Sequence, residues 1–93
     1  MDIEEVKKSW MKRGFSFATG TIKAGDAIHK ASHKDKDELV MMEAGSYEFT
    51  LDDNAFTQAG KEEVFIPAGV THSIKNLSDR DATIFYGYRP KVA

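Results

Sequence analysis

The sequence predicts one all-β domain, a sandwich or barrel of short strands with a single short helix at its N-terminal end. Three observations lead to this prediction. Apolar residues recur at helical spacing only near the start of the 93-residue chain. After residue 14, short segments rich in β-branched and aromatic residues alternate with turns that contain glycine or aspartate. Seven or eight such strands without a second helix must close into a barrel or pair as two sheets.

The helix is predicted over residues 2–13. Asp2 and Glu5 have the spacing of a capping box, and Ile3, Val6 and Trp10 recur at helical spacing. A glycine at position 14 supplies the stop. We expect the strands to form one barrel over about residues 15–90, so that residues 1–93 make a single domain, because a chain of this size supports only one modest core.

The strands are predicted, in order, at residues 15–23, 27–33, 38–42, 46–51, 55–58, 63–66, 71–76 and 82–88. In the third of these segments, Leu39, Val40, Met41 and Met42 are consecutive and apolar, so both faces of that strand need cover. One face would line the barrel interior. The other must meet a second sheet, the helix that carries Trp10 or a partner subunit.

Composition limits the partners and the location. Thirteen basic and fifteen acidic residues give a net charge of −2, which provides no basic field for nucleic acid or an anionic membrane. We therefore expect a small-molecule ligand or substrate, and neither nucleic acid nor membrane. The absence of cysteine excludes thiolate metal sites and is typical of a reducing compartment. Residues 1–10 contain no apolar run of signal-peptide length, so we expect a cytoplasmic protein.

Two of the three histidines lie close to a glutamate. His29, Ala31 and His33 would share one face of a strand. His33 and Glu38 are an odd number of residues apart, so one continuous strand would place them on opposite faces. The polar residues 34–37 provide a bend that lets both side chains reach the same opening of the barrel. His72 follows a predicted turn at residues 66–69, but periodicity alone does not decide whether it faces the first pair.

The first of these stretches resembles a motif of the cupin family. That motif has a glycine, five residues, His-x-His, three or four residues, Glu, six residues and Gly. In this chain Gly25, Ala31, His33, Glu38 and Gly45 stand at those positions, so only the first histidine is missing.

The second cupin motif has Pro-x-Gly, two residues, His, three residues and Asn. Pro67, Gly69, His72 and Asn76 match every one of these positions, whereas the opening glycine, Gly60, lies one residue too far upstream. The chain also resembles a group of small single-domain cupins of unassigned activity. The resemblance implies a cupin jelly-roll barrel, a double-stranded β-helix, and a homodimer.

The resemblance also implies a divalent metal ion held by His33, Glu38 and His72, with Ala31 in place of the fourth ligand. Two imidazoles and a carboxylate would leave open positions on octahedral iron or one on tetrahedral zinc. The sequence does not distinguish Fe, Mn, Zn and Ni, and it leaves open that no metal binds.

Further pocket residues are expected to be His29, Ala31, Met42, Tyr86 and Tyr88. Two functions remain open at this point. The first is a metal-dependent cupin, of oxygenase, isomerase or lyase type if it is an enzyme, that binds or transforms a small organic molecule. The second is a metal-free, non-enzymatic ligand-binding or sensor cupin in which the histidines form hydrogen bonds. In a third reading the protein is a structural dimer with a vestigial cavity.

Overall fold

The computed structural model describes residues 2–91, apart from the side chains of residues 30 and 31. Helix α1 spans Ile3–Lys12. The strands are β1 (Ala18–Ile22), β2 (Ala27–Ala31), β3 (Lys36–Met42), β4 (Ser46–Leu51), β5 (Asn54–Ala59), β6 (Val64–Ile66), β7 (His72–Asn76) and β8 (Ala82–Pro90). Within the described residues, the predicted all-β architecture with one N-terminal helix is confirmed. No helix in this part of the chain is long and apolar enough to span a membrane.

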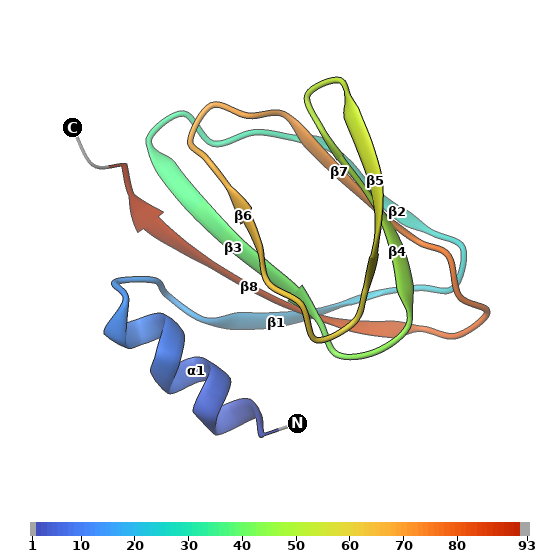
Figure 1. Ribbon diagram of the computed structural model, residues 1–93, viewed down its shortest axis with the longest axis horizontal. Coiled ribbons are helices and arrows are strands. Elements are labelled where there is room, and N and C mark those ends of the chain that lie inside the picture. Colours follow the sequence, from blue (N-terminus) through green and yellow to red (C-terminus); the bar gives the residue numbers. More distant parts are fainter. Residues whose placement is uncertain (1, 92–93) are drawn as a thin grey trace.

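The strands form two antiparallel sheets of four strands each, which face each other (Figure 1). One sheet has the order β1-β8-β3-β6 and the other has the order β2-β7-β4-β5. Apart from the β4–β5 hairpin, each strand lies in the opposite sheet from the strand before it. The space between the sheets therefore receives side chains that are far apart in the sequence.

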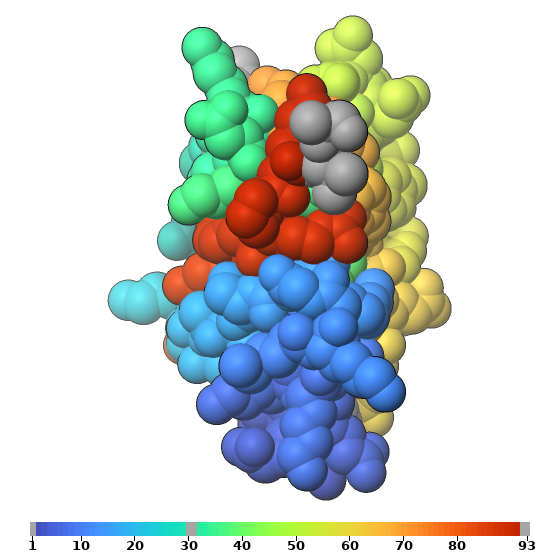
Figure 2. All heavy atoms as spheres, turned by 90° about the vertical axis from the view of Figure 1, so that its left-hand side faces the viewer, coloured from blue at the N-terminus to red at the C-terminus, as the bar shows by residue number. Residues whose placement is uncertain are grey.

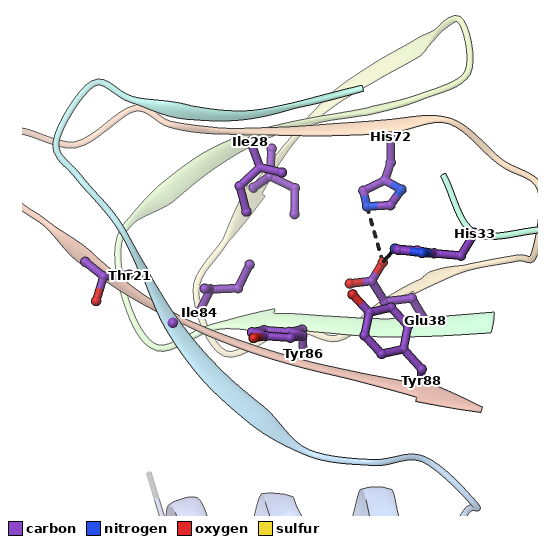
Figure 3. Close-up of a pocket in the computed structure, with 10 residues that line it drawn as sticks. Thr21, Ile28, His33, Glu38, His72, Ile84, Tyr86 and Tyr88 are labelled. Carbon is purple, nitrogen blue, oxygen red and sulfur yellow. Dashed lines mark ion pairs between the residues drawn. The ribbon is translucent and has the colours of Figure 1, made fainter. Parts of the chain in front are cut away.

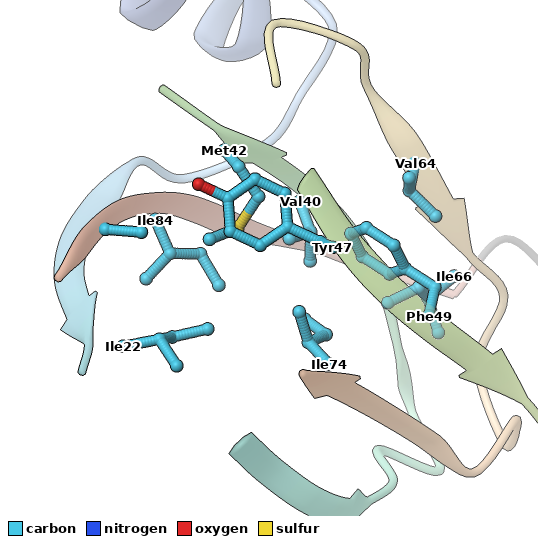
Figure 4. Packing of buried hydrophobic residues seen from close by; sticks show 10 residues of the cluster. Ile22, Val40, Met42, Tyr47, Phe49, Val64, Ile66, Ile74 and Ile84 are labelled. Atoms are coloured by element: carbon cyan, nitrogen blue, oxygen red, sulfur yellow. The ribbon is translucent and has the colours of Figure 1, made fainter. Parts of the chain in front are cut away.

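The two sheets enclose a hydrophobic core (Figure 4). Val40 and Met42 from β3 meet Phe49 from β4 and Ile74 from β7, and each of these four residues is at most 1% exposed. Side chains alternate along a strand, so Glu38 shares the inner face of β3 with Val40 and Met42. This alternation places a carboxylate at one end of an apolar core.

Helix α1 covers the outer face of β3 and β8. Trp10 is fully buried there in a second cluster with Leu39, Met41 and Phe85. Figure 2 shows the N-terminal segment, in blue, lying directly against β8, in red. The cover needed by the second face of β3 is thus supplied by the helix that carries Trp10.

The helix begins and ends where the sequence predicts, but the first strand does not. Asp2 caps α1 by accepting a hydrogen bond from a backbone N–H of the first turn, and Gly14 follows its end with a φ of 90°. Strand β1 begins at residue 18 rather than at residue 15. Phe15 and Phe17 pack into the outer cluster under α1, so their aromatic side chains serve burial and not strand pairing.

Candidate metal centre

Two imidazoles and one carboxylate meet at one end of the inner core, from His33, Glu38 and His72 (Figure 3). One ligand atom from each residue lies within 4.8 Å of the other two. Glu38 Oε1 is 3.2 Å from His72 Nε2 and 3.8 Å from His33 Nε2. The fold therefore brings together the three residues to which the two sequence motifs point.

A turn at residues 67–69 connects the segments that carry these side chains. The Ala68 N–H donates to Asp37 Oδ1 at 2.9 Å, which attaches the turn to β3 beside Glu38. The Gly69 N–H donates to the carbonyl oxygen of His33 at 2.9 Å. Because β7 begins with His72 shortly after this turn, a single turn fixes the positions of both histidines relative to the carboxylate.

A β-bulge in β2 changes which residues face the cavity. In the pairing of β2 with β7, Ile28 is opposite Ile74, whereas Ala31 is opposite His72. These two pairs differ by one residue in register, and an extra residue in one strand interrupts the alternation of side chains. Ile28 consequently lines the cavity, whereas His29 is exposed and does not. The sequence had led us to expect His29 on the inner face.

The three residues border a cavity of about 340 Å³ between the sheets. Its lining consists of Gly20, Thr21, Ile28, His33, Glu38, His72, Ile74, Ile84, Tyr86 and Tyr88. Tyr86 and Tyr88, which the sequence analysis placed in the pocket, are among these residues. Met42, also expected there, is not among them and packs in the core, 1% exposed. The side chain of Ala31, also predicted in the pocket, is outside the described residues.

Some lining residues were missed from the sequence. Ile74 and Ile84 carried a usable signal, because each lies two residues from a predicted site residue on its own strand and so shares its face. Gly20 carried none. It reaches the cavity only because β1 pairs with β8, where Gly20 is opposite Ile84.

No protein-family model matches the sequence, and no curated protein matches it. Solved structures share its architecture. The Schizosaccharomyces pombe Cnp3 cupin domain matches with a TM-score of 0.77 and 19% identity, over 84% of this chain and 54% of that one. A Cupin 2 conserved barrel domain protein from Salinispora arenicola matches with a TM-score of 0.71 and 17% identity, over 82% of this chain and 63% of that one. A predicted oxalate decarboxylase from Thermotoga maritima matches with a TM-score of 0.75 and 19% identity, over 89% of this chain and 73% of that one.

The chain has the cupin fold. At these identities the likeness concerns the fold alone, and the chain spans only about half the length of the S. pombe protein.

Two further residues of the motifs have structural roles. Gly69 has a φ of 86°, a conformation that favours glycine, and its N–H is the donor to the loop that carries His33. Asn76, fully buried, donates to the carbonyl oxygens of Ile22 and Arg80 at 3.0 and 2.8 Å. Both residues therefore have structural roles outside the cavity lining.

Tyr88 packs against two of the three candidate ligands. Its ring makes a T-shaped contact with His33, with 4.8 Å between centroids. Burial, together with the negative charge of Glu38 and a hydrogen bond to that carboxylate, raises the pKa of Tyr88 above its usual 10. The hydroxyl therefore stays protonated at neutral pH beside the Glu38 carboxylate.

The residues present fit a divalent ion. Glu38 Oε1 is buried and accepts no hydrogen bond within the described part of the chain, although His72 Nε2 is only 3.2 Å away. Ligand atoms at about 2.1 Å from one metal and at right angles to each other are about 3 Å apart. The separation between Glu38 and His72 meets this value. The separation between Glu38 and His33 is longer, 3.8 Å, and His33, with 35% of its side chain exposed, has room to move towards the other two ligands.

Proposed function

We propose that this cupin holds one divalent metal ion with His33, Glu38 and His72, and that the ion binds a small organic molecule inside the cavity. The observation that carries the proposal is the buried Oε1 atom of Glu38, which accepts no hydrogen bond within the described residues while two imidazole nitrogens lie 3.2 and 3.8 Å away. Leaving such an oxygen unpaired is costly. A cation at this point would satisfy it together with both nitrogens.

The chain's residues would hold, orient and shield the bound molecule. The mixed nitrogen and oxygen ligands suit Fe, Mn, Zn or Ni without preference. A bound ion would polarise an oxygen atom of the molecule as a Lewis acid. The hydroxyl of Tyr88 would donate to Glu38 and so fix the orientation of that ligand. The apolar part of the cavity would keep water away from the bound molecule, an arrangement compatible with binding and with transformation.

A metal-free ligand-binding function is the alternative, and one observation favours it. The Nδ1 atom of His72 is buried and has no hydrogen-bond partner within the described residues. Histidines that bind metals almost always donate their other N–H to a carboxylate, carbonyl or water. No partner for this nitrogen lies among the described residues, so the two functions need to be separated by measurement.

Metal analysis of protein purified without a histidine tag tests the proposal. We expect about one divalent ion per chain. Replacing His72→Ala or Glu38→Gln should lower metal affinity at least tenfold, about 1.4 kcal/mol, because each change removes one of three ligands. The β-rich far-ultraviolet spectrum should be retained.

The chain offers a matched control for this test. His29 is exposed and does not line the cavity, so His29→Ala should leave the metal content unchanged. The proposal fails if His72→Ala keeps full occupancy. A metal-free wild-type protein that does not take up any of the four ions in titration would favour the alternative function.

A further inference from the structure

The cavity has two chemically different ends (Figure 3). The candidate ligands His33, Glu38 and His72 lie at one end with Tyr88, whereas Ile28 and Ile84 lie at the other. Ile74 adds a third isoleucine to the lining. A molecule that binds a metal with its polar atoms would therefore extend its remaining atoms towards aliphatic side chains.

The charge of the cavity limits the charge of that molecule. No lysine or arginine is among the lining residues that the structure describes. Glu38 supplies one negative charge, so a divalent ion leaves about one positive charge to be balanced. A second anionic group on the ligand would be buried without a cationic side chain among the described lining residues, which is costly. The site therefore suits a neutral or singly charged molecule better than a dianion.

Gly20 occupies the wall of the apolar end. A Cβ atom added at this position would lie 3.4 Å from Ile84 Cγ2 and 3.6 Å from Tyr86 Cε1, both of which are ordinary contact distances. The φ of Gly20 is not positive, so the backbone does not require glycine here. Glycine inside a strand lowers stability and is typical of a place that a ligand approaches closely. The consequence of this glycine is open space beside Ile84 and Tyr86.

We propose that Gly20 sets the size of the apolar end, and that the ligand is a small monoanionic or neutral molecule with oxygen donors at one end and a compact branched or aromatic group at the other. This inference rests on the proposed metal centre. A cavity of about 340 Å³ is at the lower end of the roughly 300–1,000 Å³ that ligand pockets span, which agrees with a molecule of this kind.

Three probes test the ligand class on metal-loaded protein by calorimetry. 4-Methyl-2-oxopentanoate has a two-oxygen head, one negative charge and a branched tail. Pyruvate has the same head without the tail, and oxalate is a dianion without a tail. We expect the branched probe to bind at least tenfold more tightly than pyruvate, because its extra carbons become buried among the isoleucines. It should also bind more tightly than oxalate.

Variants of β1 test the role of Gly20. Gly20→Val should reduce affinity for the branched probe at least tenfold and change affinity for pyruvate less than about threefold, because only the tail needs the lost space. Gly20→Ala adds a single carbon at contact distance and should give the same pattern with a smaller loss if the valine variant does not fold. The control is Thr19→Val, at the neighbouring exposed position outside the cavity lining, which should behave as wild type.

The outcomes separate this inference from the function on which it rests. Protein that takes up no metal overturns both. Protein that takes up metal but binds pyruvate or oxalate as tightly as the branched probe overturns only the ligand class. Equal losses for pyruvate and the branched probe in the Gly20 variants, with metal binding intact, would show that Gly20 does not set the size of the apolar end.

Discussion

Asn76 connects the two sheets through one buried side chain. It lies in β7, but its amide donates to the carbonyl oxygen of Ile22 in β1 at 3.0 Å and to that of Arg80 at 2.8 Å. Its own oxygen accepts from the N–H and the hydroxyl of Ser78 at 2.9 and 2.8 Å. Both donor and acceptor functions of the amide are therefore used inside the protein.

Asn76→Ala should lower the free energy of unfolding by roughly 3 kcal/mol, because it removes the hydrogen bonds of a fully buried amide, including the buried one to the carbonyl oxygen of Ile22. Urea denaturation measures the change. The exposed neighbour on the same strand provides a control, and Lys75→Ala should cost less than about 0.5 kcal/mol. If Asn76→Ala lowers the free energy of unfolding as little as Lys75→Ala does, water replaces the hydrogen bonds of the amide.

At the scale of single residues, the sequence indicated which side chains lie together where a motif spans a turn. It did not do so where a strand is irregular. The grouping of His33, Glu38 and His72 was implied by the resemblance to the two cupin motifs, whereas periodicity alone left the position of His72 open. The exposed position of His29 depends on a bulge between Ile28 and Ala31. A bulge is set by pairing with another strand, so period-two reasoning along one strand does not reveal it.

At the scale of elements, the turns were the most predictable feature. Seven of the eight strands begin within two residues of the predicted position, because the glycine, aspartate and proline residues that end them act locally. Strand β1 is the exception. The alternation of Phe15 and Phe17 is typical of a strand, but both side chains pack under α1. A local sequence pattern therefore indicates that side chains are buried, but not which element covers them.

Asp37 links three elements beside the candidate metal centre. Its carboxylate accepts hydrogen bonds from the Ala68 N–H at 2.9 Å and from the Arg89 guanidinium at 3.2 Å. Strands β3 and β8 are thereby attached to the turn at residues 67–69. The backbone hydrogen bond from Ala68, followed by the hydrogen bond and charge of Arg89, lowers the pKa of Asp37 below its usual 3.8 against the opposing effect of burial.

This lowered pKa predicts a dependence of stability on acid. A carboxyl group with a lower pKa in the folded protein than in the unfolded chain contributes stability above the unfolded pKa, about 3.9. That contribution is lost as the pH falls through the folded pKa. Asp37→Asn should therefore be less stable than wild type at pH 7, and the difference should shrink below about pH 4.

Thermal unfolding between pH 2 and 7 measures this difference. Asp53→Asn, at an exposed position in the turn between β4 and β5, is a matched control and should follow the wild-type profile. A constant difference between Asp37→Asn and wild type across this range would mean that the charge of Asp37 does not contribute.

At the scale of the whole molecule, the sequence showed that β3 is apolar on both faces but not what covers the second face. Helix α1 supplies that cover over Leu39 and Met41. The cover ends before the edge of the sheet: Phe65 in the edge strand β6 pairs with Leu39 and is still 46% exposed. The outer face of this sheet is therefore partly apolar and open beyond the helix.

Phe65 gives the predicted homodimer a specific surface. An edge strand with an exposed aromatic side chain is a typical site of association, and a chain this short gains stability from burying more apolar area. Light scattering should give twice the 10.4 kDa mass of the chain at tens of micromolar, roughly where a weak specific interface is populated.

Phe65→Ser should shift the mass towards the monomer, whereas Leu77→Ser, which removes an equally exposed leucine from the segment between β7 and β8, should not. A wild-type protein that stays monomeric at this concentration would contradict the dimer, and a dimer unaffected by Phe65→Ser would place the interface elsewhere.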